Sequence, residues 1–259
     1  MHVAARLAAD SPPVPLTRDQ ANYLGAVMRL APGDQIAGFN GEDGEWRCRL
    51  TAITKRAGAL EAEERLRPPT PPPDLWLLFA PLKKARTDFV VEKATELGCR
   101  RILPVLTRRT NAERVKHERL QAHAVEAAEQ CGLVYVPEVA APQTLDQALA
   151  AWPAERRVMF CDERAAGFGT TGPLPVPPAT TALQGFGGSP DPSPEPWAIL
   201  CGPEGGFDPQ EAARIAALPG ALAVGLGPRV LRADTAALAA ITLWQSLCGD
   251  WRDAAAPAP

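Results

Sequence analysis

The sequence lacks any run of about 18 consecutive apolar residues, the length at which a segment becomes a candidate membrane-spanning helix. Its first residues contain no basic leader followed by an apolar stretch, so we expect no signal peptide. Its 6 cysteines form no C-x-x-C pair and its 3 histidines form no pair at helical spacing, which argues against a metal site and for reduced thiols in the cytoplasm. An excess of basic residues is also lacking, and the net charge of −3 excludes a protein whose whole surface coats nucleic acid.

The chain is long enough for two domains, with 259 residues. Residues 68–73 read PPTPPP, and because proline lacks a backbone N–H this segment cannot continue a helix or a central strand. We interpret it as a semi-rigid linker. Before it, residues 1–67 are β-rich, with a helical turn or two around 20–30. A turn-forming cluster at 40–44 separates 35–39 from 45–53, which predicts a hairpin.

After the linker, residues 74–250 alternate between strand and helix patterns. Strands are expected at 75–80, 101–106, 134–136, 158–161, 197–201 and 221–226, and helices at 88–97, 113–130, 145–152, 209–217 and 234–248. This alternation predicts an α/β fold, with a mostly parallel sheet covered on both faces. Residues 165–196 are rich in Pro, Gly, Ser and Thr, and we interpret them as a flexible insertion.

Two glycine-bearing loops follow late strands and lead into helices. Residues 202–207 read GPEGGF and precede Asp208, which is expected to cap a helix with proline at N1 and an acid at N3. The second loop, 226–235, reads LGPRVLRADT. Because ligands of parallel sheets bind at the carboxyl ends of strands, we expect the two loops to share a cleft. The residues fit neither a dinucleotide fingerprint, which would need Gly or Ala in place of Val230, nor a P-loop, since no Gly-Lys-Ser/Thr occurs.

Together these loops resemble those of the RsmE family, SPOUT-superfamily methyltransferases that act on ribosomal RNA. The resemblance extends to KARTDF at 84–89, VEKATELG at 91–98, RRT at 108–110 and EAAEQCG at 126–132, and in the first domain to VMRL at 27–30, GD at 33–34 and FNG at 39–41. It implies a PUA-like β-barrel that docks RNA (1–67), joined to a trefoil-knotted SPOUT domain (74–250), and a homodimer. It also implies S-adenosyl-L-methionine as the cofactor and methylation of a uridine at N3 in 16S ribosomal RNA, with the assembled small ribosomal subunit as the substrate.

The resemblance also implies roles for individual residues. The expected cofactor-binding residues are Leu200, Cys201, Gly202, Pro203, Gly205, Gly206, Leu226, Gly227, Val230, Leu231 and Thr235. Basic residues attract phosphates, and the expected RNA contacts are Arg29, Lys84, Arg86, Arg108, Arg109 and Arg229. Two positions depart from the family pattern: Asp234 stands where glutamate is common, and Leu133 where arginine is common.

The chemistry of the reaction suggests a catalytic set. Uridine N3 carries a proton at neutral pH, so attack on the methyl sulfonium requires a negative charge to be generated and stabilised. Neither loop contains a histidine. We hypothesise that Arg232 stabilises this charge, that Arg229 positions phosphate, and that Glu204 or Asp234 orients the arginine or accepts the proton.

Two other functions stay open at this point. A non-catalytic RNA-binding assembly factor would share the basic clusters and bind no cofactor, and a related knotted methyltransferase acting on transfer RNA would share the loops. No residue in the sequence specifies uridine. Residues 235–248 include no charged residue, so this last helix should be buried on most sides, either in its own core or against a second subunit.

Overall fold

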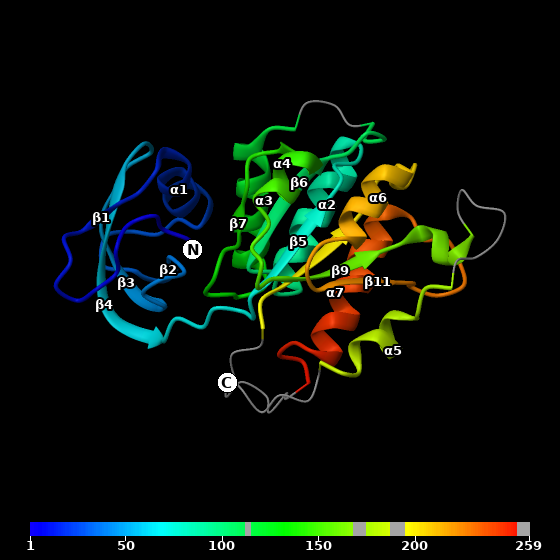
Figure 1. The fold of residues 1–259 in the computed structure, drawn as a ribbon. Helices are drawn as coiled ribbons and strands as arrows, with labels where there is room; N and C mark the ends of the chain where they lie inside the picture. The colour runs from blue at the N-terminus through cyan, green and yellow to red at the C-terminus, as the bar shows by residue number, and fades with distance from the viewer. Residues whose placement is uncertain (112–114, 168–174, 187–194, 253–259) are drawn as a thin grey trace. The chain divides into compact units, whose positions relative to one another are not determined.

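The computed structural model describes residues 1–111, 115–167, 175–186 and 195–252 (Figure 1). The chain divides into two compact units, one of Met1–Pro71 with Ala128–Val136 and one of Pro72–Ala127 with Pro137–Pro259. The first change of unit falls within the proline-rich segment 68–73, where missing backbone donors prevent the preceding sheet from continuing.

The first unit is built on a four-stranded antiparallel sheet with the order β1-β4-β3-β2. Its elements are β1 (Val14–Pro15), α1 (Arg18–Asn22), the π-helix η1 (Tyr23–Val27), β2 (Gln35–Phe39), β3 (Glu45–Ile53) and β4 (Gly58–Arg67). The predicted hairpin is confirmed, because β2 and β3 pair antiparallel. Side chains along β3 alternate between the two faces of the sheet. Cys48 and Leu50 are fully buried on one face, whereas Arg49 forms ion pairs with carboxylates on β4.

The second unit contains a parallel sheet with the order β11-β9-β10-β5-β6-β7, and β8 pairs with β6. Its strands are β5 (Leu75–Phe79), β6 (Arg101–Leu106), β7 (Glu138–Val139), β8 (Gln143–Thr144), β9 (Arg157–Cys161), β10 (Trp197–Cys201) and β11 (Ala221–Val224). Its helices are α2 (Lys84–Glu96), α3 (His117–Gln130), α4 (Leu145–Ala150), the 3-10 helix η2 (Glu163–Ala166), α5 (Ala179–Leu183), α6 (Pro209–Ala216) and α7 (Ala233–Leu247). The predicted α/β class with a parallel sheet is confirmed.

Helices cover both faces of the parallel sheet (Figure 1). On one face, Phe160 and Leu200 pack with apolar side chains of α4 and α6. The neighbouring positions Met159 and Ile199 point to the other face because strand side chains alternate, and they are also fully buried. On that face α7 contacts β10, α2 and α5. Burial on both faces explains why these strands read as continuous apolar runs in the sequence.

Several element boundaries differ from expectation, and two differences have a clear physical reason. Helix α2 begins at Lys84, before the predicted start at residue 88. The reason is the buried Thr87 hydroxyl, which accepts the N–H of Leu82 at 2.9 Å and donates to the Leu82 carbonyl at 2.8 Å, and so closes the loop that precedes the helix. The strand expected at 134–136 is wrong: the strand in this region is β7, which begins after Pro137, a residue that cannot donate to a β ladder.

The segment 165–196 is not irregular throughout. It contains α5, whose side chains Ala179 and Leu183 are buried, and α5 packs against α7. Residues 179–183 therefore form a helix within the segment that we interpreted as a flexible insertion. The parts at 168–174 and 187–194 lie outside the described residues.

Helix α7 contributes to the core along one side only. Ala237, Ile241 and Trp244 are buried on that side, whereas Leu238 and Leu243 are half-buried. The expectation of burial on most sides is therefore not met within this chain alone.

In the described part of the chain, no helix combines the length and the hydropathy that crossing a membrane requires.

Phe160 offers a test of the core beneath the parallel sheet. It is 1% exposed, and its ring meets that of Phe207 edge to face with centroids 5.3 Å apart. We expect Phe160→Ala to lower the free energy of unfolding by about 3–5 kcal/mol, because the truncation leaves a cavity. Phe89→Ala, at a ring 39% exposed on α2, is the matched control and should change it by about 0.5 kcal/mol or less. Denaturant titration measures both variants, and equal losses would contradict this placement of Phe160.

Candidate active site

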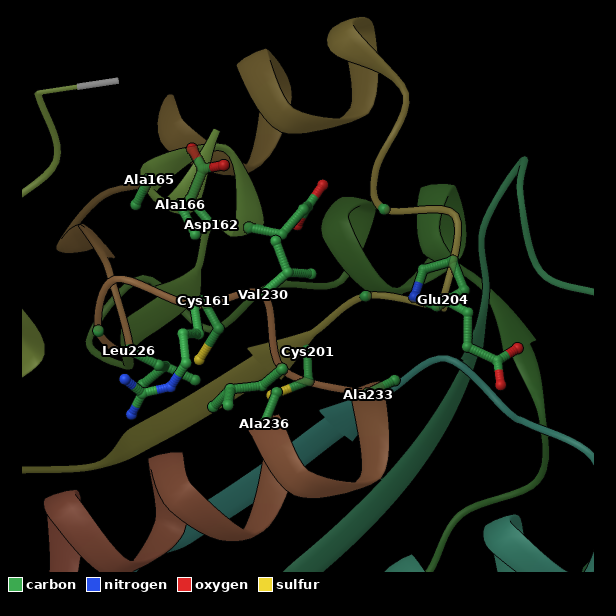
Figure 2. Close-up of a pocket in the computed structure, with 17 residues that line it drawn as sticks. Cys161, Asp162, Ala165, Ala166, Cys201, Glu204, Leu226, Val230, Ala233 and Ala236 are labelled. Carbon is green, nitrogen blue, oxygen red and sulfur yellow. The ribbon is translucent and has the colours of Figure 1, made fainter. Parts of the chain in front are cut away.

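Three loops meet at the carboxyl edge of the parallel sheet. Because β11, β9 and β10 are parallel neighbours, the residues that follow each strand lie together. They enclose an open cavity of about 610 Å³ (Figure 2). Its lining residues are Cys161, Asp162, Glu163, Ala165, Ala166, Cys201, Gly202, Pro203, Glu204, Gly206, Leu226, Gly227, Arg229, Val230, Leu231, Ala233 and Ala236.

Two cysteines line the cavity at the strand ends. Cys161 and Cys201 are in-register neighbours on β9 and β10, and Figure 2 shows them side by side. A hydrogen bond with Cys201, together with burial, raises the pKa of the Cys161 thiol well above its ordinary value. This thiol therefore stays protonated at neutral pH and behaves as a small apolar group rather than as a nucleophile.

The loop after β9 holds two carboxylates in different environments. Asp162 accepts two hydrogen bonds from the Arg164 guanidinium, at 2.8 Å from Nε and 2.7 Å from Nη2. Glu163 instead accepts the backbone N–H of Phe207 at 2.9 Å, and burial raises the pKa of its carboxyl. Glu163 thereby ties the loop after β9 to the loop after β10.

The GPEGGF loop is fixed from three directions. Gly206 has φ +69, and a Cβ there would lie 2.2 Å from Glu163 Oε1, so only glycine fits beside this carboxylate. Arg109 Nη1 donates to the Gly205 carbonyl at 2.9 Å. Asp208 caps α6 with proline at N1 and an acid at N3, which confirms the predicted cap.

The two candidate carboxylates face Arg86 rather than Arg232. Arg86 Nη1 lies 3.5 Å from Glu204 Oε1, and Arg86 Nε lies 3.8 Å from Asp234 Oδ2. Arg232 is exposed at the N-cap of α7 and does not line the described cavity. The expected pairing of these carboxylates with Arg232 is therefore corrected to a pairing with Arg86.

Most residues expected to bind the cofactor line the cavity: Cys201, Gly202, Pro203, Gly206, Leu226, Gly227, Val230 and Leu231. Three others do not line it. Leu200 points into the core shared with α4 and α6, Gly205 lies against Arg109, and Thr235 is exposed at the start of α7.

Sequence reasoning missed the contribution of β9. The cavity residues that it did not single out are Cys161, Asp162, Glu163, Ala165 and Ala166, at and after the end of β9, together with Ala233 and Ala236 of α7. A signal was available, because 158–161 was expected to be a strand and the carboxyl ends of parallel strands are where ligands bind.

The expected RNA contacts occupy different environments. Arg229 lines the cavity, and Lys84 lies with Arg86 in the first turn of α2. Arg108 Nη1 donates to Asp208 at 2.9 Å, so both it and Arg109 already link loops within the second unit. Arg29 belongs to the first unit and has φ +59, a left-handed conformation that is uncommon for a residue with a side chain. In the described ranges, no group of three or more His, Cys, Asp or Glu residues is placed to hold a metal ion.

Comparison with known proteins defines the class. Residues 69–245 match the family described as RNA methyltransferase domain, and residues 16–62 match the RNA methyltransferase PUA domain. The parallel sheet with its cavity and the antiparallel first unit are thus the two parts of an RNA methyltransferase, and the predicted PUA-like character of the first domain is confirmed.

The relatives define the family. The chain is 32% identical over 232 residues to ribosomal RNA small subunit methyltransferase E of Synechocystis sp., covering 88% of this chain and 71% of that protein. It is 30% identical over 241 residues to the protein of the same name in Mycobacterium bovis, covering 90% and 86%. A crystal structure of a ribosomal RNA small subunit methyltransferase E from Neisseria gonorrhoeae bound to S-adenosyl methionine has a TM-score of 0.76 at 28% identity, covering 96% of this chain and 98% of that one. The chain belongs to the ribosomal RNA small subunit methyltransferase E family, as the resemblance to RsmE implied.

Glu163 predicts a pH dependence of stability. Burial raises its pKa above the ordinary 4.5, so the folded chain binds more protons than the unfolded chain as the pH rises past 4.5. Its contribution therefore favours folding below that pH and is lost as the pH rises through the raised folded pKa. Glu163→Gln keeps an acceptor for the Phe207 N–H and removes the titration. Its melting temperature relative to wild type should therefore increase between about pH 4 and about pH 7.

Glu195 supplies a control of opposite sign. A hydrogen bond from Arg157 lowers the pKa of Glu195, so this carboxylate stabilises the folded chain above pH 4.5. Glu195→Gln should therefore lose melting temperature relative to wild type over the same pH range. A difference in melting temperature between Glu163→Gln and wild type that stays constant across this pH range would contradict the raised pKa of Glu163.

Proposed function

We propose that this protein transfers a methyl group from S-adenosyl-L-methionine to N3 of a uridine in 16S ribosomal RNA of the small ribosomal subunit. The observation that carries the proposal is one cavity built by the loops after β9, β10 and β11, in a member of the ribosomal RNA small subunit methyltransferase E family. In this proposal residues 1–67 dock the RNA, 68–73 link the two domains and 74–250 carry out methyl transfer.

The lining of the cavity suits the methyl donor in chemistry. At Gly227, φ is +114 and a Cβ would meet nothing within 4 Å, so the backbone is open to a ligand. The carboxylate of Glu163 lines the cavity and suits a positive charge. When bound, the donor supplies an electrophilic methyl group on a sulfonium.

The chain's own residues hold the donor in this proposal. The binding residues are Cys201, Gly202, Pro203, Gly206, Leu226, Gly227, Val230 and Leu231. Arg229, which also lines the cavity, is left to position an RNA phosphate.

The proposal extends to assembly and location. The half-buried Leu238 and Leu243 of α7, on a helix without charge from 235 to 247, fit against a second copy of the chain. A homodimer is therefore proposed, and solution mass measurement tests it. Action on the assembled small subunit places the protein in the cytoplasm.

The direct test is methyl transfer from labelled donor to small subunits isolated from cells without this modification, followed by nucleoside analysis. We expect labelled N3-methyluridine in 16S ribosomal RNA, and less label in naked RNA. A non-catalytic assembly factor would bind no S-adenosyl-L-methionine in calorimetry. Label appearing in transfer RNA instead would favour the transfer RNA methyltransferase.

A substitution that fills the cavity tests whether it is the donor site. Val230 lines the cavity yet is 51% exposed, so Val230→Trp should obstruct the cavity without disturbing the core. We expect calorimetry to show donor affinity reduced about tenfold or more, since each 1.4 kcal/mol lost is a factor of ten. Leu66→Trp, at a side chain 41% exposed on β4, is the control for donor binding and should match wild type. Unchanged affinity in Val230→Trp would place the donor elsewhere.

A further inference from the structure

Arg86 lies where three separate segments of the second unit meet. It belongs to the first turn of α2, whereas Glu204 is in the loop after β10 and Asp234 is in the first turn of α7. Its guanidinium reaches both carboxylates, with Nη1 3.5 Å from Glu204 and Nε 3.8 Å from Asp234. Two carboxylates on different segments thus hold one cation in place.

These contacts leave the guanidinium able to donate to a ligand. Both distances exceed the usual N–H···O range of about 2.7–3.2 Å, so the carboxylates attract the cation without forming short hydrogen bonds to it. The Arg86 side chain is 34% exposed, so a substrate can reach it. Arginine presents its donors in a planar fork, which suits the planar edge of a carbonyl-bearing base.

The position of Glu204 shows where the Arg86 guanidinium lies relative to the cavity. Glu204, Ala233 and Ala236 all line the cavity. Figure 2 shows Glu204 beside Ala233, at the side of the site away from Ala165 and Ala166, with its carboxylate directed away from the two cysteines. Arg86, which approaches that carboxylate, therefore lies at the rim of the cavity, where a base presented from outside meets a ligand held within.

We propose that Arg86 is a catalytic residue for methyl transfer, and that Glu204 and Asp234 are positioning residues acting through it. This inference rests on the proposed function and assigns the cation that the reaction requires. The N3–H of the target uracil releases its proton to water, and the resulting negative charge spreads over N3 and the two ring carbonyl oxygens. The Arg86 guanidinium donates to one of these oxygens. The N3 lone pair then forms a bond to the methyl carbon while the carbon–sulfur bond breaks and its electron pair stays on sulfur, giving N3-methyluridine and a neutral thioether.

The physical effect of Arg86 is on the acidity of the uracil. A cation within a few ångströms favours the ionised form of an acid and lowers its pKa by about 1–3 units. The anionic fraction at neutral pH then rises about tenfold for each unit of that lowering until most of the uracil is ionised, so the gain reaches the lower part of the factor of about 10²–10³ lost when one donor to a developing anion is removed. The advantage disappears at alkaline pH, where the uracil ionises without help.

The experiment measures single-turnover methylation of small subunits from neutral to alkaline pH. We expect Arg86→Gln to lose about 10²–10³ in rate near neutrality and progressively less as the pH rises. Small subunits assembled with 5-fluorouridine in place of uridine have a more acidic N3–H and should restore much of the rate of the variant. Arg86→Lys keeps the charge and should retain the wild-type shape of the pH profile at a lower rate. Donor affinity, measured by calorimetry, should be the same in all three proteins.

Arg214→Gln is the matched control, because it removes an exposed arginine of α6 that pairs with Asp146 and does not line the cavity. It should follow the wild-type profile. A loss in Arg86→Gln that is equal at every pH, or a pH-dependent loss in Arg232→Gln in its place, would overturn the assignment. A pH profile of Arg86→Lys that lacks the wild-type shape would also overturn the assignment. This second variant keeps the test decisive if Arg86→Gln does not fold. Failure of wild type to methylate any RNA would instead overturn the proposed function.

Discussion

The site depends on the parallel alignment of three strands that follow one another along the chain, β9, β10 and β11, but that lie in the sheet in the order β11-β9-β10. Parallel strands end at the same edge, so the loops that follow them are brought together without any contact between the loops themselves. Contacts between loops then fix the details. Glu163 accepts the N–H of Phe207, and Gly206 provides the space that its carboxylate occupies. Because β9 lies between β10 and β11, its following loop lies between the two glycine loops, and Glu163 reaches the loop after β10 from there.

Short sequence patterns were sufficient to predict much of the fold. The strands at 101–106 and 197–201 were predicted with the bounds that the structure gives, because long apolar runs between turn signals are typical of buried parallel strands. The cap at Asp208 was predicted from its spacing to a proline and an acid. The start of α2 was missed because the hydroxyl of Thr87, rather than a conventional cap, closes the loop before it. Such a contact has no signature in a short window of sequence.

Sequence reasoning missed the site residues whose contacts depend on the order of the strands in the sheet. Glu163 and Phe207 are 44 residues apart, and nothing in the residues between them states that β9 neighbours β10. The same limit applies to the arginine that pairs with the candidate carboxylates. Arg232 is close to Asp234 in sequence, but Asp234 lies at the first turn of a helix while Arg232 precedes it, exposed to solvent. Arg86 reaches the same carboxylate from a helix far earlier in the chain.

The distribution of charge around the cavity separates binding from chemistry. At the strand ends, Cys161 holds its proton because burial and the hydrogen bond with Cys201 disfavour the thiolate, and Asp162 is already matched by Arg164. The other charged side chains that line the cavity are those of Glu163, Glu204 and Arg229. At the rim, Arg86 stands between two carboxylates at distances that allow attraction without full neutralisation. In the proposed reaction the carboxylate of Glu163 suits the positive sulfonium of the donor, whereas the Arg86 cation suits a base that must become an anion before it reacts. Methyl transfer requires the donor and the activated base to meet, and in the proposed reaction the loops at the strand ends hold the donor while Arg86, at the start of α2, meets the base.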